Sequence, residues 1–164
     1  MGAIGRINKS PLNARSKKTL RDVARRSKKI AVLSSTYTHT QSNTTLANVT
    51  GLSASVEAGV NYFYRIYLAG AANASGGLKF GVTAPTATGT VYGSQTVVST
   101  STASTSLATI AGGVTAAACP IVASGVYKPS TDGTFQVQAA QNASNASDST
   151  ILPGSYLILE ELLV

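Results

Sequence analysis

The charged residues of this chain are concentrated at one end of the sequence, and this limits its possible folds more than any other feature. Ten of the 13 Lys and Arg residues lie before residue 30, where Asp22 is the single acid, so this segment carries +9. The rest of the 164 residues hold three cations against five acids, a net −2. Because long surface helices need charged side chains, this nearly uncharged body favours strands and small-residue turns.

Alternation of side chains with a period of two predicts the strands of the body, residues 34–164. The clearest run is 60–68, where one set of alternating residues is expected to face the core. About eight such runs, separated by Gly, Pro and Asn turns, predict an all-β fold, an antiparallel β-sandwich or jelly roll. We expect the strands around Phe135 and Tyr156 to pair. The predicted core consists of Tyr62, Tyr64, Ile66, Leu68, Leu78, Phe80, Val82, Phe135, Val137, Leu157 and Leu159.

Residues 1–33 are predicted to form an extended basic arm that contains a short helix. Thr19 can cap this helix, and Asp22 in its first turn favours the positive end of the helix dipole. Leu20 and Val23 form a thin apolar stripe, too small to stabilise an isolated helix in water. We therefore expect the arm to become ordered on an acidic partner, either a protein lattice or nucleic acid. The predicted contact residues are Arg6, Lys9, Arg15, Lys17, Lys18, Leu20, Arg21, Val23, Arg25, Arg26, Lys28 and Lys29.

Two aromatic residues are expected on the side of the clearest strand that faces away from the core. Phe63 and Tyr67 alternate with the core set of the run 60–68. A small sandwich seldom leaves two such side chains in water, because exposed apolar patches mark interaction sites. Phe63 and Tyr67 are therefore predicted to mediate self-association, as a homotrimer.

Residues that carry catalysis or bind metals are sparse. His39 is the only histidine and is expected to be an exposed strand residue, while Cys119 is expected to be a buried, unreactive thiol. Glu160 and Glu161 are adjacent in a predicted strand, so they point to opposite faces and cannot form a catalytic pair. The sequence predicts no enzyme, no catalytic residue, no metal and no cofactor. No run of roughly 18 apolar residues is present, so no membrane partner is expected.

Several short motifs of the body resemble a β-rich module of tailed-bacteriophage virion proteins, found in head decoration, head-fibre and tail-fibre proteins. The resemblance covers residues 45–160, implies no catalytic residues and does not include the arm. The motifs lie at residues 48–52 (NVTGL), 57–59 (EAG), 62–65 (YFYR), 76–80 (GGLKF), 135–144 (FQVQAAQNAS) and 154–157 (GSYL).

The resemblance implies a structural virion protein, made in the host cytoplasm and located in the capsid. A decoration (cement) protein that binds the major capsid protein lattice through its arm and body is the leading hypothesis. A fibre or receptor-binding module is the first alternative, although the chain has no shaft before the module. The second alternative is a jelly-roll coat protein whose basic arm binds packaged nucleic acid.

Overall fold

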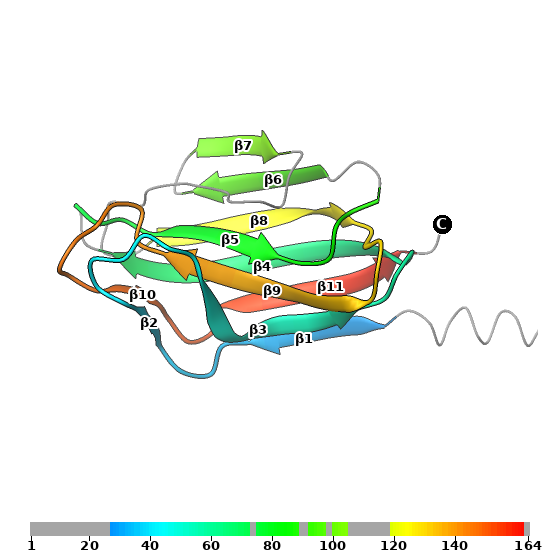
Figure 1. Cartoon of the computed structure of the whole chain (residues 1–164), viewed down its shortest axis with the longest axis horizontal. Coiled ribbons are helices and arrows are strands. Elements are labelled where there is room, and N and C mark those ends of the chain that lie inside the picture. The colour runs from blue at the N-terminus through cyan, green and yellow to red at the C-terminus, as the bar shows by residue number, and fades with distance from the viewer. Residues whose placement is uncertain (1–26, 73–74, 89–91, 98–99, 105–118, 163–164) are drawn as a thin grey trace, which may run out of the picture.

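The computed structural model describes residues 27–72, 75–88, 92–97, 100–104 and 119–162, which form strands, turns and loops and no helix (Figure 1). The predicted arm helix at Thr19 lies outside the described residues. In chain order the strands are β1 (Lys28–Val32), β2 (Tyr37–His39), β3 (Ala47–Val56), β4 (Asn61–Ala72), β5 (Lys79–Thr83), β6 (Tyr92–Val97), β7 (Thr100–Ser104), β8 (Cys119–Tyr127), β9 (Gly133–Ala140), β10 (Ser149–Ile151) and β11 (Tyr156–Leu162).

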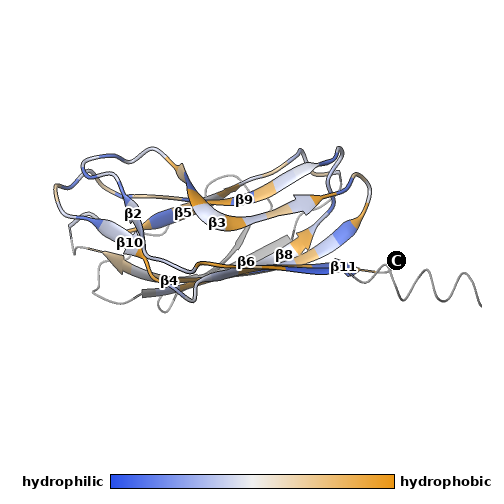
Figure 2. Cartoon of the chain, turned by 90° about the horizontal axis from the view of Figure 1, so that it is seen from below, coloured by the Kyte–Doolittle hydropathy of each residue, from blue (hydrophilic) through white to orange (hydrophobic). Residues whose placement is uncertain are grey.

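These strands build two antiparallel sheets that face each other, as Figure 2 shows. The large sheet has eight strands in the order β1-β11-β4-β8-β6-β7, and β10 pairs with both β2 and β4. The small sheet has the order β3-β9-β5. The predicted all-β antiparallel fold is confirmed. The expected pairing of the Phe135 and Tyr156 strands is wrong, because β9 and β11 belong to different sheets and the chain crosses between layers after β9.

The start of the body differs from the predicted boundary after residue 33. β1 pairs with β11 from Lys28 opposite Glu160 to Val32 opposite Tyr156, and the Leu33 side chain that follows is buried. The two lysines at the start of β1, Lys28 and Lys29, are among the predicted contact residues of the arm. A strand at the sheet margin tolerates them because long lysine stems can lie along apolar surface while the ammonium stays polar.

The inner faces of the two sheets form one hydrophobic core. All eleven predicted core residues are buried, so the faces assigned from the alternation are confirmed. Phe135 of the small sheet lies between Tyr64 and Tyr127 of the large sheet, with ring centroids 5.5 Å and 5.4 Å away. The prediction that His39 is exposed is wrong. Its side chain is 1% exposed, and Nε2 lies 2.9 Å from the Asn43 carbonyl oxygen.

Ionisation of the buried Tyr127 should destabilise the protein at alkaline pH. Its hydroxyl donates to the Pro85 carbonyl at 2.5 Å, and burial, followed by repulsion from Tyr62, raises the pKa of Tyr127 from 10.0 to about 12. Between these values the phenol ionises in the unfolded chain but not in the native one, which favours unfolding. The contribution of neutral Tyr127 to the free energy of unfolding is fully present below pH 10 and should decrease as the pH rises towards 12.

Urea unfolding of the wild type and of Tyr127→Phe at a series of alkaline pH values tests this prediction. The variant should be less stable at neutral pH, because it lacks the hydrogen bond to Pro85, and should lose less stability at alkaline pH. Tyr156→Phe, which alters a half-exposed ring, is the control and should follow the wild type. Equal alkaline losses in wild type and Tyr127→Phe would contradict the prediction.

Candidate interaction surface

The large sheet has one side that β3, β9 and β5 do not cover, and we call this side the outer face (Figure 2). On β4 the inner residues are buried, and the alternate residues Phe63, Arg65 and Tyr67 point to the outer face. Phe63 and Tyr67 are partly buried, and Arg65 is exposed. The two predicted self-association residues therefore share one face, about 13 Å apart along the strand.

Strand register places further apolar side chains beside these two. Tyr67 lies opposite Tyr156 on β11 and Val122 on β8, and the rings of Tyr67 and Tyr156 stack with centroids 5.5 Å apart and planes at 23°. Phe63 lies opposite Val126 on β8. Residues directly opposite each other in an antiparallel pair share a face, so these side chains form a connected surface.

β1 extends this surface to the margin of the sheet. Ile30 lies opposite Ile158, and Val32 lies opposite Tyr156. Ile30 is 57% exposed and Val32 is 55% exposed, the largest exposures among the large hydrophobic side chains of the described residues. These two residues and Tyr156 were not among the predicted site residues, because only long-range pairing brings them to the β4 strand.

The electrostatic character of the outer face is set by a few free charges. Arg65 stands near its middle, beside Ile158, and Lys28 and Glu160 lie opposite each other at one end. None of these three groups forms an ion pair within the described part of the chain. Over β1, β11, β4 and β8, the outer face is therefore mostly apolar, with one central cation that a partner carboxylate could neutralise.

The predicted arm contacts are only partly within the described residues. Ten of them, from Arg6 to Arg26, lie outside. Lys28 is exposed on the outer face, whereas Lys29 points to the core side. Its Nζ donates to the Ser55 carbonyl at 2.8 Å and lies 5.7 Å from the centroid of the Tyr62 ring. The Lys29 side chain therefore bridges the edges of the two sheets, and its ammonium is already bound by the Ser55 carbonyl.

The motif at residues 48–52 forms an irregularity at the margin of the small sheet. The register of β3 and β9 shifts between Asn48 and Ser53. The Gln136 amide bridges this gap, because Nε2 donates to the carbonyls of Val49 at 3.0 Å and Leu52 at 3.2 Å. Gly51 has φ of 92°, a backbone conformation that other residues rarely adopt. This part of the motif shapes the backbone.

The motif at residues 154–157 interrupts the large sheet in the same region. Leu152 to Ser155 form a turn with Pro153 second, Gly154 third at φ of 88° and a 3.3 Å hydrogen bond from Ser155 N to the Leu152 carbonyl. These features are typical of a type II turn. The turn separates β10 from β11 and lies opposite residues 33–36, which separate β1 from β2.

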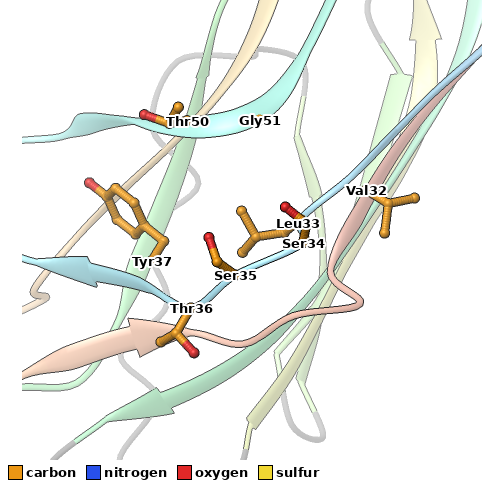
Figure 3. Close-up of a pocket in the computed structure, with 8 residues that line it drawn as sticks. All are labelled: Val32, Leu33, Ser34, Ser35, Thr36, Tyr37, Thr50 and Gly51. Atoms are coloured by element: carbon orange, nitrogen blue, oxygen red, sulfur yellow. The ribbon is translucent and has the colours of Figure 1, made fainter.

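A pocket of about 240 Å³ lies beside this double interruption, between the break in the large sheet and the β3 irregularity (Figure 3). Leu33, Ser35 and Tyr37 point into it, and Thr50 and Gly51 border it. The hydroxyls of Ser35, Tyr37 and Thr50 have no hydrogen-bond partner within the described residues. The pocket combines an apolar floor with free neutral hydroxyls and has no charged lining residue.

The described residues hold no group of three His, Cys, Asp or Glu side chains placed to bind a metal, and none of their elements is a helix able to cross a bilayer. The Cys119 side chain lies outside what the structure describes. The features that stand out are thus surfaces: the outer face, the margin at β1 and the adjoining pocket. No protein-family model, curated protein or solved structure matches the chain.

Proposed function

We propose that the chain is a structural virion protein, a capsid decoration protein that binds the major capsid protein lattice. The single observation that carries this proposal is the outer face, where Phe63, Tyr67, Tyr156, Ile158, Ile30 and Val32 form one mostly apolar surface on a body of few charges. Contiguous exposed apolar surface is typical of protein-binding sites. A lattice of protein subunits would cover the part of this face that a trimer contact through Phe63 and Tyr67 leaves open, at Ile30, Val32 and Ile158.

The contrast between the two sides of the sandwich supports this orientation. The outer side of the small sheet is polar, with Gln138 Nε2 donating to Asn48 Oδ1 at 2.9 Å and Thr83 exposed. Uncharged amides and hydroxyls on that side remain compatible with water after the opposite face is covered. We infer that the outer face of the large sheet points towards the particle and the small sheet points away from it.

The resemblance to phage virion modules is the second support. Three of its motifs shape the backbone. Residues 48–52 form the β3 irregularity, and residues 154–157 contribute to the turn before β11. In the motif at residues 57–59, the Ala58 N–H donates to Asp132 Oδ1 at 2.8 Å and Gly59 has a positive φ. A jelly-roll strand order and an arm that becomes ordered on the lattice belong to the same proposal. The chain would be made in the host cytoplasm and would end up in the capsid.

Immunogold labelling of particles from cells that make the chain tests the proposal. Antibodies against the body should label the outer surface of intact heads. Label confined to fibres would replace this function by the fibre or receptor-binding alternative. Antibodies against the body that label intact heads, together with antibodies against residues 1–26 that label only opened heads, would favour the coat-protein alternative, in which the arm binds packaged nucleic acid. Unlabelled particles would refute a virion role altogether.

Self-association through the outer face is a separate prediction of the same proposal. The full chain should sediment as a trimer at micromolar concentration, because trimer formation would remove Phe63 and Tyr67 from water. Tyr67→Glu should shift it to monomer, since burying an unpaired carboxylate is costly. Thr83→Glu adds the same charge to the polar side of the small sheet and should leave the trimer intact. A wild-type monomer at high micromolar concentration would contradict the prediction.

A further inference from the structure

Among the described residues, β1 is the margin of the large sheet (Figure 1). Within the described residues, the pairing partner of β1 is β11. Ser27 accepts a hydrogen bond from Glu161 N at 3.3 Å, Leu33 N donates to Ser155 at 2.8 Å, and the Leu33 carbonyl accepts from Gly154 N at 2.9 Å. Residues 27 and 33 therefore face β11.

Antiparallel pairing alternates along a strand, so residues 27, 29, 31 and 33 face β11. The backbone N–H and C=O groups of Lys28, Ile30 and Val32 then point away from the sheet. A row of free donors and acceptors on a sheet margin is a template for another strand. β1 thus offers three residues whose N–H and C=O groups bond no other described strand.

The side chains of the same three residues favour pairing with another polypeptide. Ile30 and Val32 are more than half exposed on the outer face, and Lys28 is exposed beside them. A strand added along β1 would place its residues opposite Ile30 and Val32 on that face, next to Ile158 and Tyr156. It would cover apolar surface and satisfy backbone groups at once.

The pocket lies where such a strand would continue. Along an antiparallel partner strand, the residue opposite Leu33 comes just before the residue opposite Val32. The side chain of this partner residue would point to the core side, as the Leu33 side chain does, and hence towards the pocket bordered by Thr50 and Gly51. A ring with a hydroxyl suits this apolar floor with the free hydroxyls of Ser35 and Tyr37 (Figure 3).

We propose that the free margin of β1, together with the pocket beside it, binds an extended segment of a partner protein as an added antiparallel strand. Main-chain hydrogen bonds would give affinity, and the pocket would give specificity. The segment would carry apolar residues opposite Ile30 and Val32, a neutral hydrogen-bonding side chain at the pocket and an acid opposite Lys28. Only the identification of the partner as a capsid protein rests on the function proposed above.

A second copy of this chain fits the margin less well. Antiparallel pairing of two β1 strands about Ile30 would place Lys28 of each copy opposite Val32 of the other. Each Lys28 ammonium would then face an apolar side chain across the new contact, with Glu160 of its own copy as the nearby acid. A partner acid opposite Lys28 would instead be attracted to it, so charge complementarity favours a different polypeptide.

The probe is the peptide Thr-Tyr-Val-Thr-Ile-Thr-Glu, whose Glu lies opposite Lys28 and whose Tyr lies opposite Leu33 when it pairs antiparallel to β1. Binding to the full chain is followed by amide hydrogen exchange and by fluorescence anisotropy of the labelled peptide. The peptide should slow exchange at Lys28, Ile30 and Val32. Methylating the amide nitrogen of the peptide Ile, which leaves the protein unchanged, should weaken binding at least about tenfold.

Two substitutions at one position separate backbone pairing from side-chain contact. Ile30→Pro removes an N–H that does not bond β11, so the sheet should tolerate it, and binding should fall at least about tenfold. Ile30→Thr keeps the N–H and should bind better than the proline variant. Equal binding of the methylated peptide, or no binding to the wild type, would overturn the inference.

Two further outcomes distinguish a partner peptide from a second copy of the chain, and the strand site from the virion function. If the amides of Lys28, Ile30 and Val32 are protected in the free chain only at concentrations where it self-associates, a second copy occupies the margin and the inference is wrong. If the chain binds the peptide but antibodies do not label heads, the strand site stands and the virion function fails.

Discussion

Replacing Phe135 with alanine should lower the free energy of unfolding by about 3–5 kcal/mol, because the change leaves a cavity in a fully buried aromatic cluster. Phe135 belongs to the small sheet, and its ring contacts Tyr64 and Tyr127 of the large sheet, so the substitution weakens the junction between the layers. Urea unfolding followed by circular dichroism measures the loss.

Phe63→Ala is the matched control, since it removes the same side chain from the outer face. Phe63 is only partly buried, so the free energy of unfolding should change much less than in Phe135→Ala. Both measurements belong at a concentration where the chain is monomeric, because self-association would add stability to the wild type. Equal losses would show that the outer face is as tightly packed as the core.

The alternation of residues 62–68 was sufficient to place the core because side chains on a strand alternate strictly between two faces. A shift by one residue would bury Arg65 and expose Tyr64, so only one assignment is reasonable. The same reasoning placed Phe63 and Tyr67 on the outer face. Local sequence therefore predicted both the core and the first members of the candidate interaction surface.

The remaining features depend on contacts between distant parts of the chain. β1 was missed because Lys29 occupies a core-side position, and only the nearby Ser55 carbonyl and Tyr62 ring make that position acceptable. His39 was assigned to the wrong side because β2 has three residues, too few to show an alternation. The pocket needs two breaks opposite each other, which no single segment of sequence reveals.

Two N-terminal truncations should differ sharply in stability. Deleting residues 1–26 leaves β1 intact, so thermal unfolding should match that of the full chain. Deleting residues 1–33 removes β1, the Lys29 contacts and the Leu33 side chain, which is 5% exposed. It also uncovers the β11 margin of the sheet. Loss of the buried leucine alone costs about 3 kcal/mol or more, so the shorter chain should be unfolded or aggregated. Equal melting temperatures for the two truncations would contradict the pairing of β1 with β11.

The shorter deletion also separates folding from attachment. Residues 1–26 carry eight cations against Asp22, a net +7, so their removal should leave a folded body that no longer decorates particles. Charge reversal at Arg21, Arg25 and Arg26 together should weaken attachment of the protein to particles without unfolding the body.

The affinity of the full chain for particles should fall as salt concentration rises. The fall should be less steep than that expected if the arm released one counterion from a phosphate for each of its cations, because docking on protein also buries Leu20 and Val23. Wild-type affinity of the truncated chain for particles would show that the arm is dispensable. Loss of affinity for DNA or RNA alone would instead favour the coat-protein alternative.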